Sequence, residues 1–284
     1  MSPTVNSHQK TASRWRMLAI LTLLAALLLP RIGLMLAAPI VPESDALAYL
    51  MMAEDFAAGR PMQDQWGQYA FYSAGYPIVL GLAFMLGGPS LSVALLLNIA
   101  LALLTLWLVI RLARELGGNG LVQWLAGMGY ALWIPAAYGA GLVQRENLST
   151  PLLLAVVLAV LQLRRGASSK LAAAIGGASF GFGLIAGASG ALVGLLFPVA
   201  FWCLLKREGF QPAIKAGAIA ASALALTVGP WLAYTNAQLG SPVLNSNSGF
   251  NFYLGNNPAA NGSFVGIQDT PMGKNWQALH ARVG

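Results

Sequence analysis

Acidic side chains are few in this chain and unevenly placed. The 284 residues include nine Asp and Glu, and four of these lie within residues 38–60, directly after a long apolar segment: Glu43, Asp45, Glu54 and Asp55. A carboxylate at a membrane surface can serve as a general base, because partial desolvation raises its affinity for protons. The stretch 38–60 is therefore the first place to look for chemistry.

The segment DALAYLMMAEDFAAG, from Asp45 to Gly59, favours a helix. Its apolar residues Leu47, Leu50 and Met51 share one face, which suits a short helix lying along a membrane surface. Asp45 at its start is either a helix cap, a role that Ser44 could also fill, or a catalytic group. Further along, Glu54 and Asp55 are typical of solvated surface charges.

A second candidate group is the pair Arg145 and Glu146 in LVQRENLSTP. The pair stands at the end of an apolar run, where charged groups are costly unless they meet a partner or a water-filled cavity. It is either functional or a snorkelling pair that fixes the end of the helix. Other cations that could meet a phosphate on the same side of the membrane are Arg31, Arg60, Lys274 and Arg282.

Several other kinds of chemistry find no support. His8 and His280 are the two histidines and lie near opposite ends, so a His-based catalytic set or metal site is not expected. Cys203 is the single cysteine, which excludes a disulfide within the chain. No P-loop or dinucleotide-binding motif is present. We therefore expect no cofactor, and no residue cluster supports a divalent metal.

Composition places the chain in a membrane. Hydrophobic residues make up 57% and charged residues 9%, and the mean hydropathy is +0.65. Soluble domains usually carry about a quarter charged residues. The net charge of +7 does not indicate nucleic-acid binding, because the basic residues form no extended patch. We predict an all-α integral membrane protein.

Seven segments are near the length of about twenty residues that a spanning helix needs. They cover residues 17–38, 90–112, 120–138, 147–163, 171–187, 189–205 and 214–234. The apolar run Tyr76–Gly88 is too short and is predicted to be interfacial or re-entrant. The resulting parts are a tail over 1–16, a transmembrane domain over 17–234 with a loop at 39–89, and a final segment over 235–284.

Charge asymmetry predicts the orientation. With a cytoplasmic N-terminus, 11 of the 16 basic residues fall on the cytoplasmic side and seven of the nine acids, Asp269 among them, on the outer side. The loop 39–89 and the segment 235–284 are then outside the cytoplasmic membrane. The outer segment contains NSNSGFNFYLGNNPAANGSF, which predicts turns and short strands. Its aromatic residues among amides suit either a carbohydrate-facing surface or anchoring at the membrane interface.

Five motifs occur in an order that resembles one family. They are DALAYLMMAEDFAAG, similar to Asp-x-x-x-Tyr-x-x-x-Ala; YSAGYPIVLGLAFMLGG; LLLNIALALLTLWLVIRLARELGG; GLVQRENLSTPLLL; and PWLAYTNAQLGSPVLNSNSGFNFYLGNNPAANGSF. Over roughly residues 15–265 the chain resembles the C-type superfamily of polytopic membrane glycosyltransferases. Within it, the resemblance is to the bacterial branch of protein-O-mannosyltransferases and aminoarabinose transferases.

This resemblance implies transfer of a sugar from a polyprenyl-phosphate donor to a glycan, lipid or protein acceptor at the outer face of the bacterial inner membrane. It implies an inverting displacement with Asp45 as base, Glu43 as second choice, and Glu146 orienting the acceptor or Arg145. The donor phosphate is expected at Arg60 or Arg145. Contacts with sugar or acceptor are expected from Tyr49, Tyr76, Asn256 and Asn257.

The chain departs from the family at three places. The loop AGASGAL lacks an Arg that many members carry, and SDAL has one acid where protein-mannosylating members have an Asp-Glu pair. Members also continue beyond the GNNP segment, so we expect this chain to be part of a longer protein. Two other functions remain open: a transporter or flippase for a lipid-linked precursor, and a non-catalytic assembly protein. A transporter favours polar groups at mid-membrane, whereas the acids here lie in outer loops.

Overall fold

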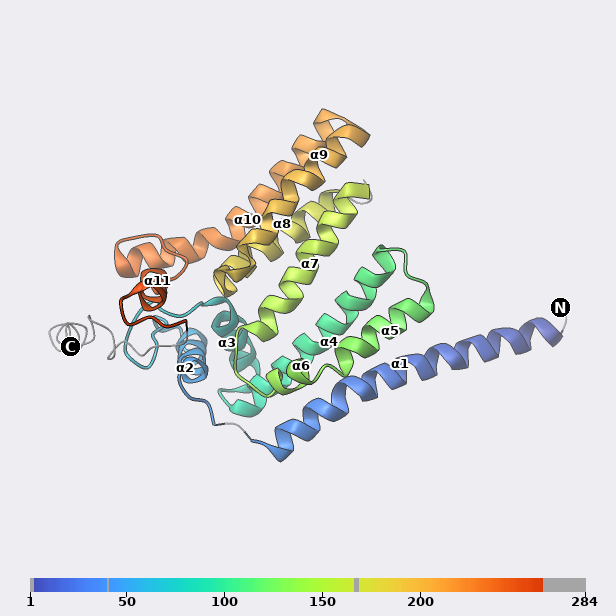
Figure 1. Cartoon of the computed structure of the whole chain (residues 1–284), viewed down its shortest axis with the longest axis horizontal. Coiled ribbons are helices and arrows are strands. Elements are labelled where there is room, and N and C mark those ends of the chain that lie inside the picture. Colours follow the sequence, from blue (N-terminus) through green and yellow to red (C-terminus); the bar gives the residue numbers. More distant parts are fainter. Residues whose placement is uncertain (1–2, 40, 166–168, 263–284) are drawn as a thin grey trace.

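The computed structural model describes residues 3–39, 41–165 and 169–262, and these residues form helices and no strands (Figure 1). The outer acid Asp269 and the cations Lys274 and Arg282 lie outside the described residues. The prediction of an all-α protein is confirmed for the part that is described. Within these described ranges, five helices are long and apolar enough to cross a membrane: Trp15–Ala37, Leu91–Glu115, Glu146–Arg165, Gly190–Glu208 and Phe210–Leu239.

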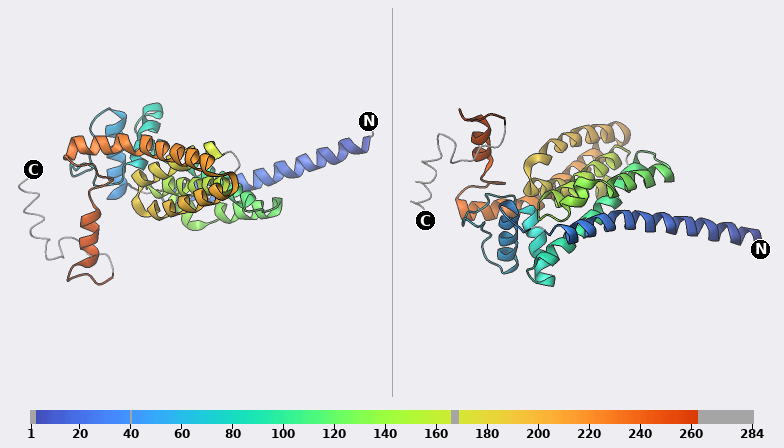
Figure 2. Two further views of the ribbon diagram at one scale, coloured as in Figure 1. Left: turned by 90° about the horizontal axis from the view of Figure 1, so that it is seen from above. Right: turned by 60° about the horizontal axis from the view of Figure 1, so that its bottom comes forward.

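The bundle is built from long helices packed side by side. Helix α1 (Pro3–Ala37) contacts α5 (Gly120–Ala131), and α5 contacts α4 (Leu91–Glu115). Next along the bundle, α4 contacts α7 (Glu146–Arg165), which packs against α8 (Ser169–Ala186) and α9 (Leu196–Glu208). Both α8 and α9 contact α10 (Phe210–Leu239), and the short 3-10 helix η1 (Ala188–Leu195) links them. In both views of Figure 2, α1 extends beyond the other helices toward the N-terminus.

Shorter helices gather at one end of this bundle. They are α2 (Asp45–Ala57), α3 (Gly75–Gly87), α6 (Ile134–Gly139) and α11 (Ser248–Asn256), and Figure 1 shows them away from the turns that join α4 to α5 and α9 to α10. We call this the acidic end, because Glu43, Asp45, Glu54, Asp55, Asp64 and Glu146 all belong to elements there. The opposite, basic end carries the cations in the last turns of α4, α7 and α9: Arg114, Arg164, Arg165, Lys206 and Arg207.

Helix α2 begins at Asp45, as its sequence predicts, and ends at Ala57, just before Gly59 with its positive φ of 67°. Its buried face consists of small and aromatic residues with a methionine: Ala48, Tyr49, Met52 and Ala53. Leu47 and Met51 stay exposed, as expected for a face turned toward a membrane surface. Helix α3 has 13 residues, too few to span, so the loop 39–89 carries two short helices that pack on each other.

The expected single helix over 120–138 is wrong, because α5 ends at Ala131 and α6 begins at Ile134. Pro135 explains the break, since proline has no N–H to donate to the carbonyl of the residue four positions earlier, Ala131. The Arg31 side chain, fully buried in α1, fills this role: its Nη1 donates to the carbonyl oxygens of Ala131 at 2.9 Å and Leu27 at 3.0 Å. A cation also suits the negative end of the α5 dipole.

The strand and turn prediction for the final segment is also corrected. Residues Ser248–Asn256 form α11, and Asn257 ends it by donating to the carbonyls of Tyr253 and Leu254. The aromatic residues of this stretch recur at helical spacing, and Phe250 packs edge to face on Phe71, with ring centroids 5.5 Å apart. That contact with the α2–α3 loop favours a helix over the local preference of Asn and Gly for turns.

Close contact between α8 and α10 depends on small residues. A Cβ added to Gly177 would lie 2.1 Å from the carbonyl oxygen of Ala220, so α10 would have to move. We expect Gly177→Ala to destabilise the protein by about 1–3 kcal/mol, the usual cost of overpacking. The matched control is Gly183→Ala on the same helix, where a Cβ meets nothing within 4 Å. Thermal unfolding in detergent should show a lower Tm for Gly177→Ala only. Equal Tm values for the two variants would contradict this packing.

Candidate functional site

The first residues of α2 and α7 meet at the acidic end and enclose a cavity of about 220 Å³. From α2 the lining residues are Asp45, Ala46 and Tyr49, and from the α6–α7 connection and α7 they run from Leu142 to Glu146. Asp45, Arg145 and Glu146, which the sequence places a hundred residues apart, therefore line one cavity.

Asp45 is the first helical residue of α2, and its N-cap Ser44 makes no side-chain capping hydrogen bond. Ser44 has a φ of 51° and ψ of −120°, a conformation that residues with a side chain rarely adopt, and its hydroxyl donates to the Asp45 carboxylate at 3.2 Å. Strain of this kind collects at functional sites. It is held here directly beside the candidate base.

Two tyrosines stand against Asp45. Burial, together with the nearby carboxylates of Asp45 and Asp64, raises the pKa of the Tyr72 hydroxyl above its usual value. Tyr49 is 3% exposed, and burial likewise raises its pKa. Its ring packs edge to face on Tyr72, with centroids 5.9 Å apart. Both hydroxyls therefore keep their protons at neutral pH near the Asp45 carboxylate.

Arg145 reaches into the same place from the residue before α7. Its Nε donates to Glu146 Oε1 at 3.1 Å and its Nη1 to Ser73 Oγ at 3.3 Å. Burial alone lowers the pKa of Arg145, but the neighbouring Glu146, Tyr49 and Asp45 outweigh this and raise it above the ordinary value. The guanidinium stays charged and is 36% exposed. An anion entering the cavity would find it accessible.

Gly187, after α8, lies beside this guanidinium. A Cβ at Gly187 would come within 3.3 Å of Arg145 Nη1, so a side chain there would crowd the guanidinium. Gly187 belongs to the AGASGAL loop. The structure thus places a cation from α7 next to a loop that has none of its own.

A second cavity, of about 270 Å³, lies on the other side of Glu146. It is bounded by α4, α5, α6 and α7, and the polar side chains in its wall include Tyr130, Gln144, Asn147 and Thr150. Glu146 lines both cavities and is 57% exposed. Its carboxylate is therefore able to face either one.

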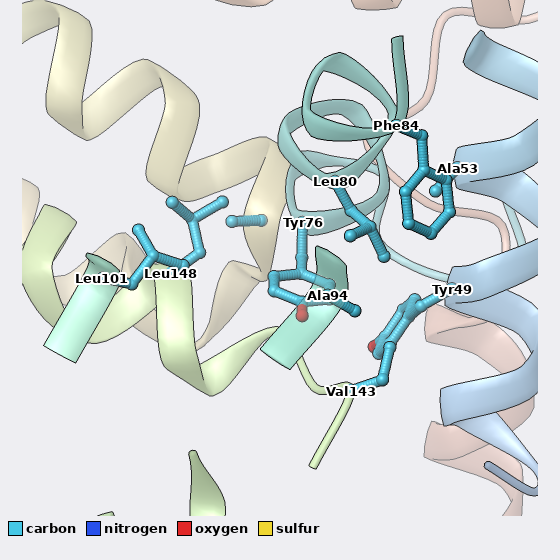
Figure 3. Close-up of a cluster of buried hydrophobic side chains, with 10 residues drawn as sticks. Tyr49, Ala53, Tyr76, Leu80, Phe84, Ala94, Leu101, Val143 and Leu148 are labelled. Carbon is cyan, nitrogen blue, oxygen red and sulfur yellow. The ribbon is translucent and has the colours of Figure 1, made fainter. Parts of the chain in front are cut away.

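Tyr76 is placed differently from its sequence expectation. It is fully buried, as part of the apolar cluster drawn in Figure 3, and its hydroxyl donates to Asn98 Oδ1 at 2.8 Å. Asn98 Nδ2 in turn donates to the carbonyls of Ala140 at 3.0 Å and Leu142 at 2.9 Å. The pair thus holds the backbone that leads to Arg145. Sequence reasoning placed Asn98 only in a family motif and missed this role, although an Asn within an apolar helix is itself a signal.

The other expected residues lie away from the cavity. Arg60 forms an ion pair with Asp55 at 2.8 Å and is 60% exposed. Asp55 is ten residues along α2 from Asp45, which is about 15 Å at the helical rise. Glu43 is exposed in the connection before α2. Asn256 donates to the Phe252 carbonyl within α11 at 2.8 Å, and Asn257 caps that helix.

The α2–α3 loop, which contains Tyr72 and Ser73, is held by α10 and by the segment after it. Ser246 N–H donates to the Ala70 carbonyl at 2.8 Å, and Met62 N–H donates to the Tyr234 hydroxyl at 2.8 Å. Asp64, 2% exposed, accepts hydrogen bonds from the N–H groups of Trp66 and Gln68 and thereby shapes the turn between them. These contacts hold the α2–α3 loop, whose Ser73 accepts a hydrogen bond from Arg145.

Within the described residues, no group of three His, Cys, Asp or Glu side chains is arranged to hold a metal ion. What the site offers is one carboxylate flanked by hydroxyls, one exposed guanidinium and a second carboxylate shared with a neighbouring cavity. No protein-family model, curated protein or solved structure matches this chain. The function is therefore argued from this geometry.

We expect Asn98→Ala to lower stability by about 1–3 kcal/mol, because it leaves buried carbonyls and the Tyr76 hydroxyl without partners. Tyr76→Phe removes only one of these hydrogen bonds and should cost less. Chemical or thermal unfolding of the purified protein measures both. If Tyr76→Phe proved at least as destabilising as Asn98→Ala, Asn98 would not be the residue that holds the loop.

Proposed function

We propose that the protein transfers a sugar from a polyprenyl-phosphate donor to an acceptor hydroxyl or amine at the acidic end of the bundle. The observation that carries this proposal is the shared cavity of Asp45 and Arg145. A base for the acceptor and a cation for the leaving phosphate are the two groups that such a displacement needs. The family resemblance of the motifs around both residues points to the same reaction.

The proposed step is a single displacement. Asp45 takes the proton of the acceptor as the acceptor oxygen or nitrogen bonds to the anomeric carbon. The bond from that carbon to the phosphate oxygen breaks, and polyprenyl phosphate leaves with the electron pair. Arg145 stabilises the anionic phosphate, and inversion at the anomeric carbon follows from attack on the face opposite the leaving group.

Glu146 is assigned to orientation. Through its hydrogen bond to Arg145 Nε it fixes the guanidinium, and through the second cavity it can meet the acceptor. Tyr49 and Tyr72 lie near Asp45 and keep their protons, so their hydroxyls are available to donate to its carboxylate. Tyr76 acts at a distance, through Asn98 and the loop before Arg145, and is a positioning residue in this proposal.

The proposal places the acidic end outside the bacterial inner membrane, since the cations that end α4, α7 and α9 lie at the other end. The proposal also includes seven membrane crossings. Five are the long helices, the sixth is formed by α5 together with α6, and the seventh is α8. The cation missing from the AGASGAL loop is supplied by Arg145, which lies beside Gly187.

The test is to reconstitute the protein in vesicles with polyprenyl-phosphate donors carrying mannose or aminoarabinose, and with membrane extract as the source of acceptor. Release of polyprenyl phosphate together with a glycosylated product is the expected result. Movement of intact donor across the bilayer without release would instead identify a flippase. Absence of both activities would favour an assembly role.

A further inference from the structure

The basic end of the bundle holds a larger cavity than the acidic end. It measures about 530 Å³ and lies between the final residues of α4, α7 and α9. Four cations line it, and two leucines, a tryptophan and a cysteine complete the wall: Arg164, Arg165, Lys206 and Arg207, then Leu116, Leu161, Trp202 and Cys203. We propose that this cavity binds the head group of an anionic phospholipid.

Most of the cations that line this cavity are not paired with a carboxylate that the structure describes. Arg165 Nη1 forms an ion pair with Glu115 at 2.8 Å. Among the described residues, Arg164, Lys206 and Arg207 form no ion pair. Arg207 Nη1 instead donates to the backbone carbonyl of Arg164 at 3.2 Å, which draws the ends of α7 and α9 together. Four cations in one recess, of which only Arg165 is paired with a carboxylate of the described residues, favour an anionic ligand.

An apolar groove adjoins this cavity. Because the groove can hold an acyl chain, we infer that the anionic ligand is a lipid. The groove, of about 540 Å³, runs between α9 and α10 and shares Trp202 with the basic cavity. Phe210 and Ile214 in its wall are 67% and 53% exposed. A soluble anion would use the cavity alone, whereas a phospholipid places its phosphate among the cations and an acyl chain along the groove.

Trp202 joins the two surfaces. The Lys206 Nζ lies 4.9 Å from the centroid of the Trp202 ring, and the ring is 59% exposed. Tryptophan favours the level of lipid head groups, and basic pockets between transmembrane helices bind anionic head groups. The site is at the opposite end of the bundle from Asp45, so it does not depend on the proposed sugar transfer.

Native mass spectrometry of the detergent-purified full chain tests this proposal. Phosphatidylglycerol and phosphatidylcholine with identical acyl chains are added separately at equal concentration. We expect phosphatidylglycerol adducts to exceed phosphatidylcholine adducts by about 10-fold, given the contribution of each cation near an anionic lipid. Equal binding of the two lipids would overturn the proposal. Loss of phosphatidylglycerol on adding inorganic phosphate in matched excess would show a site for the free anion instead.

The variant Arg164→Gln with Lys206→Gln removes two cations of the cavity, and it should abolish most of the preference for phosphatidylglycerol. Its matched control is Arg114→Gln with Lys215→Gln, which removes one Arg and one Lys at the same end but outside the cavity. The control should retain the preference. The same loss in both variants would mean that net charge, not this cavity, selects the lipid. The comparison of lipids on the unmodified protein stands even if a variant fails to fold.

Discussion

Asp45→Asn is expected to lower the rate of sugar transfer at least about 100-fold, the typical minimum contribution of a general base. The substitution keeps the size of the side chain and removes its ability to take a proton. The Ser44 hydroxyl, which donates to Asp45 at 3.2 Å, can still donate to the amide oxygen. Release of polyprenyl phosphate from a labelled donor, followed over time in reconstituted vesicles, measures this rate.

The control for Asp45→Asn is Glu54→Gln. Glu54 is an exposed carboxylate on the same helix, and its neutralisation should leave the rate within about twofold, as for other surface substitutions. Glu43→Gln distinguishes the two candidate bases of the loop. Full activity of Asp45→Asn, or loss of activity in Glu43→Gln alone, would remove Asp45 from the reaction.

Arg145→Gln is expected to lower kcat/KM for the donor about 100-fold, the cost of losing one donor to a developing anion. Both KM and kcat should change. KM should rise because the donor phosphate is already anionic when it binds, and kcat should fall because the negative charge on the phosphate grows as the bond breaks. Glu146 would also lose its partner at 3.1 Å, so Arg145→Lys is included to keep the charge without the planar guanidinium. Steady-state kinetics with varied donor separate KM from kcat.

Arg60→Gln is the informative comparison for Arg145. The sequence makes the two arginines equal candidates for the phosphate, but the structure pairs Arg60 with Asp55 at the far end of α2. Its substitution should change kcat/KM less than about threefold, in line with the small energies of exposed ion pairs. A larger loss in Arg60→Gln than in Arg145→Gln would contradict the placement of the phosphate.

Local patterns predicted the elements that carry the site. The start of α2 at Asp45 follows from a helix-favouring stretch bounded by Ser44 and Gly59, and the start of α7 at Glu146 follows from the charged pair before an apolar run. These features act within a few residues of chain. Sequence reasoning could therefore identify Asp45, Arg145 and Glu146 individually.

The contacts between these elements could not be predicted in the same way. The meeting of Asp45 with Arg145 depends on the packing of α3 against α2 and α4, and on the hydrogen bonds from Asn98 to the α6–α7 connection. For Tyr76, a motif position suggested a ligand contact, but burial and its bond to Asn98 make it structural. Both outcomes depend on residues far apart in the chain.

At Pro135, by contrast, a local signal for the break was present in the sequence, but the apolar composition of residues 120–138 was given more weight. Apolar composition favoured one helix over 120–138, yet a proline in its interior removes a hydrogen bond that only Arg31 compensates among the described residues. Tertiary contact similarly decided α11, where Phe71 meets Phe250. A Pro within an apolar run permits such a break but does not require one, since Pro30 and Pro230 lie inside the continuous helices α1 and α10.

The central claim is that Asp45 and Arg145 serve different steps within one site. Donor binding and turnover should therefore be measured on the same preparations of the wild type, Asp45→Asn and Arg145→Gln. The account predicts that Asp45→Asn binds a polyprenyl-phosphate sugar as tightly as the wild type but turns it over at least about 100-fold more slowly, whereas Arg145→Gln binds it more weakly. Wild-type turnover in Asp45→Asn, or unchanged binding and turnover in Arg145→Gln, would contradict it.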